Sequence, residues 1–126
     1  MKKRTALLSF SAFAVAVAVL QTGCSDKAMT YQANIKPILD ANCVECHAPG
    51  GTGYAKSGLR LDSYDAMMKG TKFGAVVVPG SSVSSTLYRL VSGKADPSIR
   101  MPHGQAALSD TDVSTIATWI DQGAKY

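Results

Sequence analysis

The pattern of hydrophobic and polar positions divides the 126-residue chain into an apolar leader and a longer part with mixed residues. Residues 6–20 form an apolar run that two serines interrupt, and the positively charged segment Met1–Arg4 precedes it. This run is short for a membrane-spanning helix, which needs about 20 residues, but it fits the apolar part of a secretory signal. We therefore expect a signal peptide of the lipoprotein type at residues 1–23, a tether at 24–29 and one domain at 30–126.

The first part of this domain carries an apolar stripe with helical spacing. Its members are Tyr31, Ile35, Ile38 and Leu39. Pro37 interrupts the stripe, and proline is well tolerated at the first position of a helix. The pattern predicts one or two helical turns up to Lys36, followed by a second short helix that runs from Pro37 into Cys43.

The last stretch of the chain gives the clearest helix signal. Ser109 is a suitable N-cap and Asp112 stands three residues later, as in a capping box. The apolar face that follows consists of Val113, Ile116, Ala117 and Ile120. Gly123 comes directly after the last predicted turn, where glycine commonly ends a helix.

Between these two segments the sequence predicts short elements joined by turns. Residues 48–58 are rich in glycine and predict a loop, whereas Ser63 and Gly70 are suited to begin and end a short helix. A turn is expected at Pro79-Gly80. The serines of Ser81–Ser85 offer several caps for a helix that would carry Val83, Leu87, Leu90 and Val91. Residues 95–107 are expected to be irregular.

The charge of the chain comes mostly from its leader. The precursor has 13 basic and 9 acidic residues, a net charge of +4. Removing residues 1–23 takes Lys2, Lys3 and Arg4 with it, which leaves a net charge of about +1. No basic patch remains that would indicate a nucleic-acid surface, and we expect no nucleic-acid partner.

The segment Cys43–His47 carries the chemistry of the chain. Two cysteines separated by two residues and followed by histidine form the attachment signature of a covalent c-type haem. Each thiol, of Cys43 and of Cys46, would add to a vinyl group of the porphyrin, and His47 would give a nitrogen to the iron. The expected cofactor is one haem c. An exported protein would place this motif in the periplasm, where such attachment is chemically reasonable.

The third cysteine, Cys24, follows Gly23 at the end of the apolar run. This arrangement resembles a bacterial lipobox, in which the cysteine becomes the lipid-bearing N-terminus, although Leu20 stands four residues before the cysteine instead of three. We expect lipidation at Cys24 and a lipid anchor in the membrane, because a free exposed thiol is a liability in an oxidising compartment. The alternative is an ordinary signal that leaves Cys24 as a free thiol.

An iron held by His47 needs a ligand on its other face, for which methionine and histidine are the usual candidates. The available residues are Met29, Met67, Met68, Met101 and His103. Met101 precedes a proline, which favours an extended backbone, and the loop that holds it leads into the last helix. We expect Met101 to be the distal ligand, Met67 and Met68 to fill the core, and His103 to be an exposed loop residue.

Seven segments in a fixed order resemble the single-haem class I cytochromes c, most closely the planctomycete-type cytochrome c domains. They are Ile35–Leu39, Cys43–His47, Leu59–Tyr64, Val78–Gly80, Ser85–Tyr88, Met101-Pro102 and Trp119–Ala124. The resemblance implies an all-α fold wrapped around one haem, with His47 as the proximal ligand and Met101 as the distal ligand. It also implies electron transfer, here with separate redox proteins as donor and acceptor.

The leading hypothesis is therefore an electron carrier, not an enzyme. One alternative is a haem-based sensor or small-ligand-binding domain with a labile sixth iron site. Another is a zinc site in which Cys43, Cys46, His47 and His103 supply the ligands. The adjacent pair Cys46 and His47 would have to bend toward one ion, and export disfavours reduced thiols, so we rank this alternative last.

Overall fold

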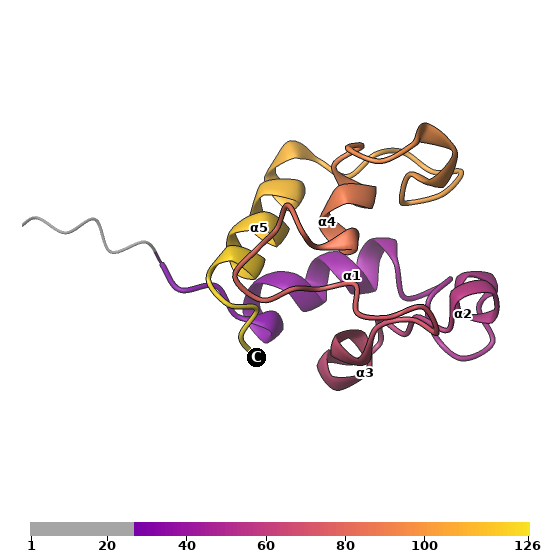
Figure 1. Cartoon of the computed structure of the whole chain (residues 1–126), viewed down its shortest axis with the longest axis horizontal. Helices are drawn as coiled ribbons and strands as arrows, with labels where there is room; N and C mark the ends of the chain where they lie inside the picture. The colour runs from indigo at the N-terminus through magenta and orange to yellow at the C-terminus, as the bar shows by residue number, and fades with distance from the viewer. Residues whose placement is uncertain (1–26) are drawn as a thin grey trace, which may run out of the picture.

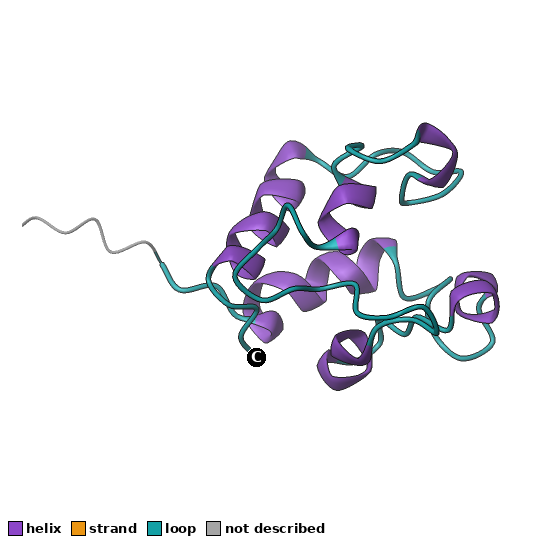
Figure 2. Ribbon diagram, in the orientation of Figure 1, coloured by secondary structure: helices purple, strands orange, loops and turns teal. Residues whose placement is uncertain are grey.

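The computed structural model describes residues 27–126, and every regular element in this range is helical (Figure 2). In chain order the elements are η1 (Tyr31–Ile35), α1 (Lys36–Asn42), α2 (Thr52–Ser57), α3 (Tyr64–Lys69), α4 (Thr86–Val91), η2 (Pro97–Ile99) and α5 (Asp110–Asp121). The fold is all-α, as the resemblance implied. Within residues 27–126 no helix has the length and hydrophobicity that a membrane crossing requires. The expected signal and Cys24 lie outside the described residues.

The first two elements form one helical run that changes geometry at a proline. Thr30 caps η1, a π-helix, by accepting a hydrogen bond from the Ala33 N–H, and α1 then continues from Lys36 with Pro37 in its first turn. Since Pro37 has no backbone N–H to donate, the turn that precedes it cannot close in the regular α pattern. The predicted division of this segment near Lys36 is confirmed.

Helix α5 begins and ends where the sequence predicted. The hydroxyl of Ser109 accepts a hydrogen bond from the Asp112 N–H (3.1 Å), and Gly123 follows the helix with a φ of 99°. The face that carries Ile116, Trp119 and Ile120 is completely buried. The predicted caps of α3 are also confirmed: Ser63 accepts from the Ala66 N–H and Gly70 has a φ of 79°.

Two local predictions were wrong. Residues 48–58 are not all loop, because α2 occupies Thr52–Ser57 and ends at Gly58, whose φ is 75°. The glycines that suggested a loop instead let α2 approach the preceding backbone closely. Val83 does not belong to a helix face: α4 starts only at Thr86, and Val83 is 69% exposed. The segment before α4 is a turn because its hydroxyls bind neighbouring backbone groups.

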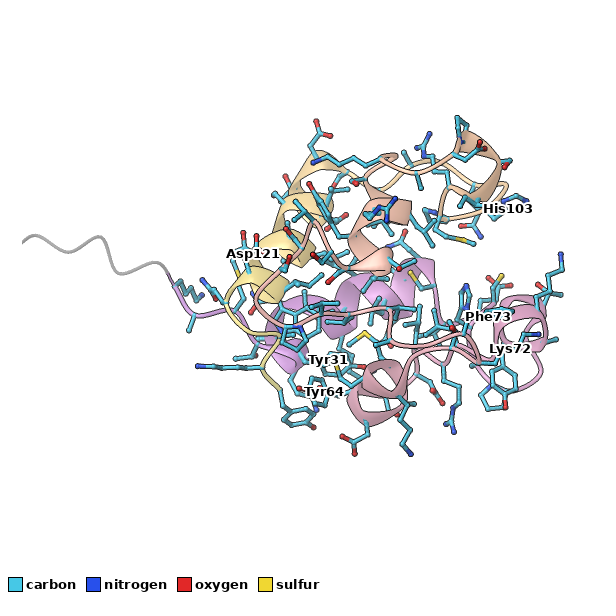
Figure 3. All side chains as sticks on the ribbon, in the orientation of Figure 1. Tyr31, Tyr64, Lys72, Phe73, His103 and Asp121 are labelled. Atoms are coloured by element: carbon cyan, nitrogen blue, oxygen red, sulfur yellow. The ribbon has the colours of Figure 1, made fainter. Side chains whose placement is uncertain are left out.

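The core joins the two ends of the described chain (Figure 1). The closest pairs of helices are α1 with η1, α5 with η1 and α4 with α5. The Tyr31 N–H and the indole N–H of Trp119 both donate to the Lys125 carbonyl, at 2.9 and 2.7 Å. Tyr31 and Tyr64 lie edge to face with ring centroids 5.4 Å apart (Figure 3). Both termini of the described chain therefore lie at one end of the molecule, and α2 lies at the other.

Candidate functional site

The Cys43–His47 segment begins where α1 ends. Cys43 is the C-cap of α1 and its N–H donates to the Leu39 carbonyl at 2.8 Å. The N–H groups of Cys46 and His47 both donate to the Cys43 carbonyl, at 3.2 and 2.9 Å. These bonds fold the segment into a compact turn. Both thiols are free, and neither is fully buried.

The environment of the thiols keeps Cys43 protonated. Burial raises the pKa of the Cys43 thiol to about 11, and the neighbouring Cys46 adds to this increase. At neutral pH the Cys43 thiol therefore keeps its proton, since a thiol is deprotonated only near or above its pKa. Both sulfur atoms come from one turn at the end of one helix, which is the local arrangement that attachment to a single flat group requires.

The imidazole of His47 is half-buried and neutral at physiological pH. Burial lowers its pKa below the ordinary value of 6.5, and the Leu59 backbone offsets only part of this effect. Its Nδ1 atom is buried and has no hydrogen-bond partner. A neutral imidazole is the form of histidine that binds a metal, so the chemistry of this side chain fits the predicted iron ligand.

The segment after α2 connects His47 to the core. The Leu61 N–H donates to the His47 carbonyl at 2.8 Å. Leu59 and Leu61 are buried, while Arg60 and Asp62 alternate with them and form an ion pair at 2.6 Å. This guanidinium lowers the pKa of Asp62. The alternation of side chains along extended backbone explains the arrangement, which holds the turn at residues 43–47 against the hydrophobic core.

The candidate distal ligands lie in different environments. Met101 follows η2, is half-buried against the core, and donates its N–H to the Leu90 carbonyl at 3.2 Å. His103, on the same loop, is exposed (Figure 3). Met67 is completely buried in the core, as its predicted filling role requires, while Met68 and Met29 pack at the edge of the core.

The side chains present fit a haem c and do not form a zinc site. The turn supplies two free thiols followed by a neutral histidine, which is the donor set of haem attachment. Within residues 27–126, no three His, Cys, Asp or Glu side chains gather closely enough to hold a metal ion. The structure therefore does not bring His103 together with Cys43, Cys46 and His47, as the zinc alternative requires.

An all-α fold with a Cys-x-x-Cys-His turn after its first helical run is typical of a c-type cytochrome domain. Residues 43–104 match the family model described as planctomycete cytochrome C, and the chain carries a domain of this family. No curated protein and no solved structure matched the chain. The family establishes a domain of the haem-binding, electron-transferring kind. The match begins at Cys43 and ends at Gly104, within the loop that holds Met101.

One contact in this site could not be predicted from the sequence. Gly53, in the first turn of α2, packs directly against the imidazole of His47. No periodic pattern links two residues six positions apart across a turn. The glycines of this segment suggested a loop, either a plain connector or one whose backbone carbonyl near Pro49 accepts a hydrogen bond from the His47 ring, and no such bond to Nδ1 is present. The contact depends on the packing of α2 against the turn at residues 43–47, which is a tertiary feature.

Proposed function

We propose that this protein is a mono-haem c-type cytochrome that carries electrons on the periplasmic side of a membrane, with His47 and Met101 as the iron ligands. The observation that carries the proposal is the family match that begins at the Cys-x-x-Cys-His turn. The free thiols and the neutral imidazole of this turn support attachment of haem at Cys43 and Cys46.

The assignment of Met101 rests on its surroundings. A ligand on the far face of the haem must be held by the fold and still lie near the surface of the core, where a flat group can pack. Met101 meets both conditions, since it is half-buried and packs against the core. Met67 is enclosed by the core and His103 is exposed, so neither is as well placed. Met68 and Met29 also lie at the edge of the core, but Met68 belongs to α3 and Met29 to the segment before η1, whereas Met101 lies in the loop that leads into α5.

Haem would supply a reversible one-electron couple between ferric and ferrous iron. In this proposal Cys43 and Cys46 hold the group covalently, and His47 and Met101 occupy both axial positions. A closed coordination shell excludes small molecules from the iron. No side chain has to act as an acid, base or nucleophile, which is why we assign the role of a carrier and not of an enzyme. The partners would be separate redox proteins.

The proposal predicts a specific spectroscopic effect of Met101→Ala. The variant should lose the thioether-to-iron charge-transfer absorption of the ferric protein. Its reduction potential should also fall, because a His/Met ligand pair raises the potential. The measurement compares oxidised and reduced spectra and a redox titration of the wild type and the variant. A haem stain after denaturing electrophoresis shows that the haem is still attached through Cys43 and Cys46.

Met68→Ala and His103→Ala are the matched controls, since they remove another half-buried methionine and the other candidate in the loop. Both should leave the charge-transfer absorption and the potential unchanged. If Met101→Ala leaves them unchanged too, Met101 is not a ligand and a sensor with a labile sixth site becomes the better assignment.

A further inference from the structure

Helix α2 packs on the haem-attachment turn through its backbone. The Tyr54 N–H donates to the Cys46 carbonyl at 2.9 Å, and the Gly51 N–H donates to the Ala48 carbonyl at 2.8 Å. A Cβ atom at position 51 would collide with the Cys46 carbonyl group and would lie 2.8 Å from the Glu45 oxygen. Only glycine fits at position 51, so the start of α2 lies directly against this turn.

Gly53 makes the second close contact of α2, and its partner is the side chain of His47. A Cβ atom at position 53 would lie 2.8 Å from both Nε2 and Cε1 of the imidazole, and 3.0 Å from the Cys46 carbonyl oxygen. Carbon atoms in contact are ordinarily separated by about 3.5–4.0 Å. Gly53 is not among the glycines with positive φ. Glycine is therefore required here because a side chain has no room beside the ring, and not because of the backbone conformation.

The orientation of the His47 ring depends on this packing. Metal-binding histidines are ordinarily oriented by a hydrogen bond from the ring nitrogen that does not bind the metal. In this structure no partner meets the distance and angle of a hydrogen bond to the buried Nδ1, although the Leu59 backbone lies near enough to the ring to raise its pKa. Gly53 lies beside the Cε1 and Nε2 atoms of the ring, and the absence of a side chain at position 53 leaves room for the ring in this position.

We propose that Gly53 is a positioning residue for His47: it sets the ring orientation and keeps Nε2 accessible to the iron. This inference rests on the proposed function, in which His47 binds the haem iron. It is specific to position 53, because the contact at position 51 involves only backbone atoms of the turn.

The substitution Gly53→Ala separates this role from an ordinary structural role. Alanine is favoured over glycine in helices, so a purely structural Gly53 would give an alanine variant with an equally or more stable α2 and an unchanged iron site. If Gly53 positions His47, the alanine variant should instead have an altered iron site. The methyl group would push the ring away from its position, while the fold persists.

The experiment uses the full mature chain in the Met101→Ala background, where the ferrous iron keeps only the histidine ligand. Resonance Raman spectroscopy then reports the iron–histidine stretching band. Gly53→Ala should shift this band to lower frequency, because a displaced ring binds the iron less well. Gly50→Ala is the matched control: position 50 has a φ of 95° and no atom within 4 Å of a built Cβ. The Gly50→Ala substitution strains the same loop without contacting His47, so it should leave the iron–histidine band unchanged.

An unchanged iron–histidine band in Gly53→Ala overturns the inference. If the Met101→Ala background protein shows no iron–histidine band, the proposed function fails. The packing of Gly53 against His47 is then tested by NMR of the His47 ring protons in the same protein. Ring signals that move in Gly53→Ala, but not in Gly50→Ala, then support the packing. Ring signals that move in neither variant overturn it.

Discussion

Two neighbouring tyrosines show how different the roles of one residue type can be. Tyr31 is 2% exposed, and its hydroxyl is buried without a hydrogen-bond partner. Burial raises the pKa of this phenol. Tyr64 is half-buried and its hydroxyl donates to the Ala124 carbonyl at 2.9 Å. The rings pack on each other, so the hydroxyl groups are the main difference between the two positions.

This contrast predicts opposite results for two identical substitutions. Tyr31→Phe should leave the free energy of unfolding unchanged or raise it, because it removes an unsatisfied buried polar group. Tyr64→Phe should lower the free energy of unfolding by about 1 kcal/mol, the net value of a typical hydrogen bond. Urea denaturation of both variants measures these effects. An equal loss of stability in both would mean that the Tyr31 hydroxyl has a partner.

At the scale of elements, one buried hydroxyl organises the turn before α4. Ser85 is fully buried and, although it stands at the N-cap of α4, its side chain bonds to the turn. It accepts from the Val78 N–H at 2.8 Å and donates to the Ser81 carbonyl at 2.8 Å. The next part of this turn is fixed by Asp121 of α5, which accepts from the N–H and the hydroxyl of Ser82 (Figure 3).

Ser85→Ala should lower the free energy of unfolding by about 1–3 kcal/mol, because it removes both hydrogen bonds of a fully buried hydroxyl. Ser84→Ala is the control, since Ser84 is exposed and its hydroxyl bonds only to that of Ser81. Its effect should stay within about 0.5 kcal/mol, as for most surface substitutions. Chemical denaturation of both variants provides the comparison, and equal effects would contradict the role assigned to Ser85.

The elements that the sequence predicted correctly depend on local signals. Ser63 and Ser109 cap helices through bonds to backbone three residues away, so the pattern is contained in a few adjacent positions. Helix α2 was missed because Gly51 and Gly53 are explained by a contact with Cys46 and His47, across the intervening turn. Glycine at these positions reflects tertiary packing, which no local rule distinguishes from a loop.

At the scale of the whole molecule, the sequence predicts the haem-attachment turn more completely than the rest of the site. Cys43, Cys46 and His47 lie within five consecutive residues, so their chemistry can be recognised without knowledge of the fold. The environment of Met101 depends on how the segment before α5 packs on the core, which the sequence does not state. The structure adds that Met101 is half-buried and His103 exposed.

The membrane anchor is a property of the whole chain and stays a prediction. If Cys24 carries lipid, the wild type should be found in the membrane fraction and should need detergent for release. Cys24→Ser should appear in the soluble periplasmic fraction with its haem still attached, because Cys43 and Cys46 are unchanged. Fractionation followed by haem staining measures both proteins. A soluble wild type with an unmodified Cys24 would rule out the anchor.

The bond between the Tyr31 N–H and the Lys125 carbonyl places both ends of the described domain together, and one helical run separates them from Cys43. The α-helical part of that run, α1, has seven residues and is about 10 Å long at 1.5 Å per residue, and η1 adds a further turn. If the haem is bound at Cys43 and Cys46 as proposed, a molecule attached to an electrode through either terminus would hold the haem away from the electrode surface. Current would then have to cross the length of the domain, whereas a dissolved partner could approach the opposite end directly.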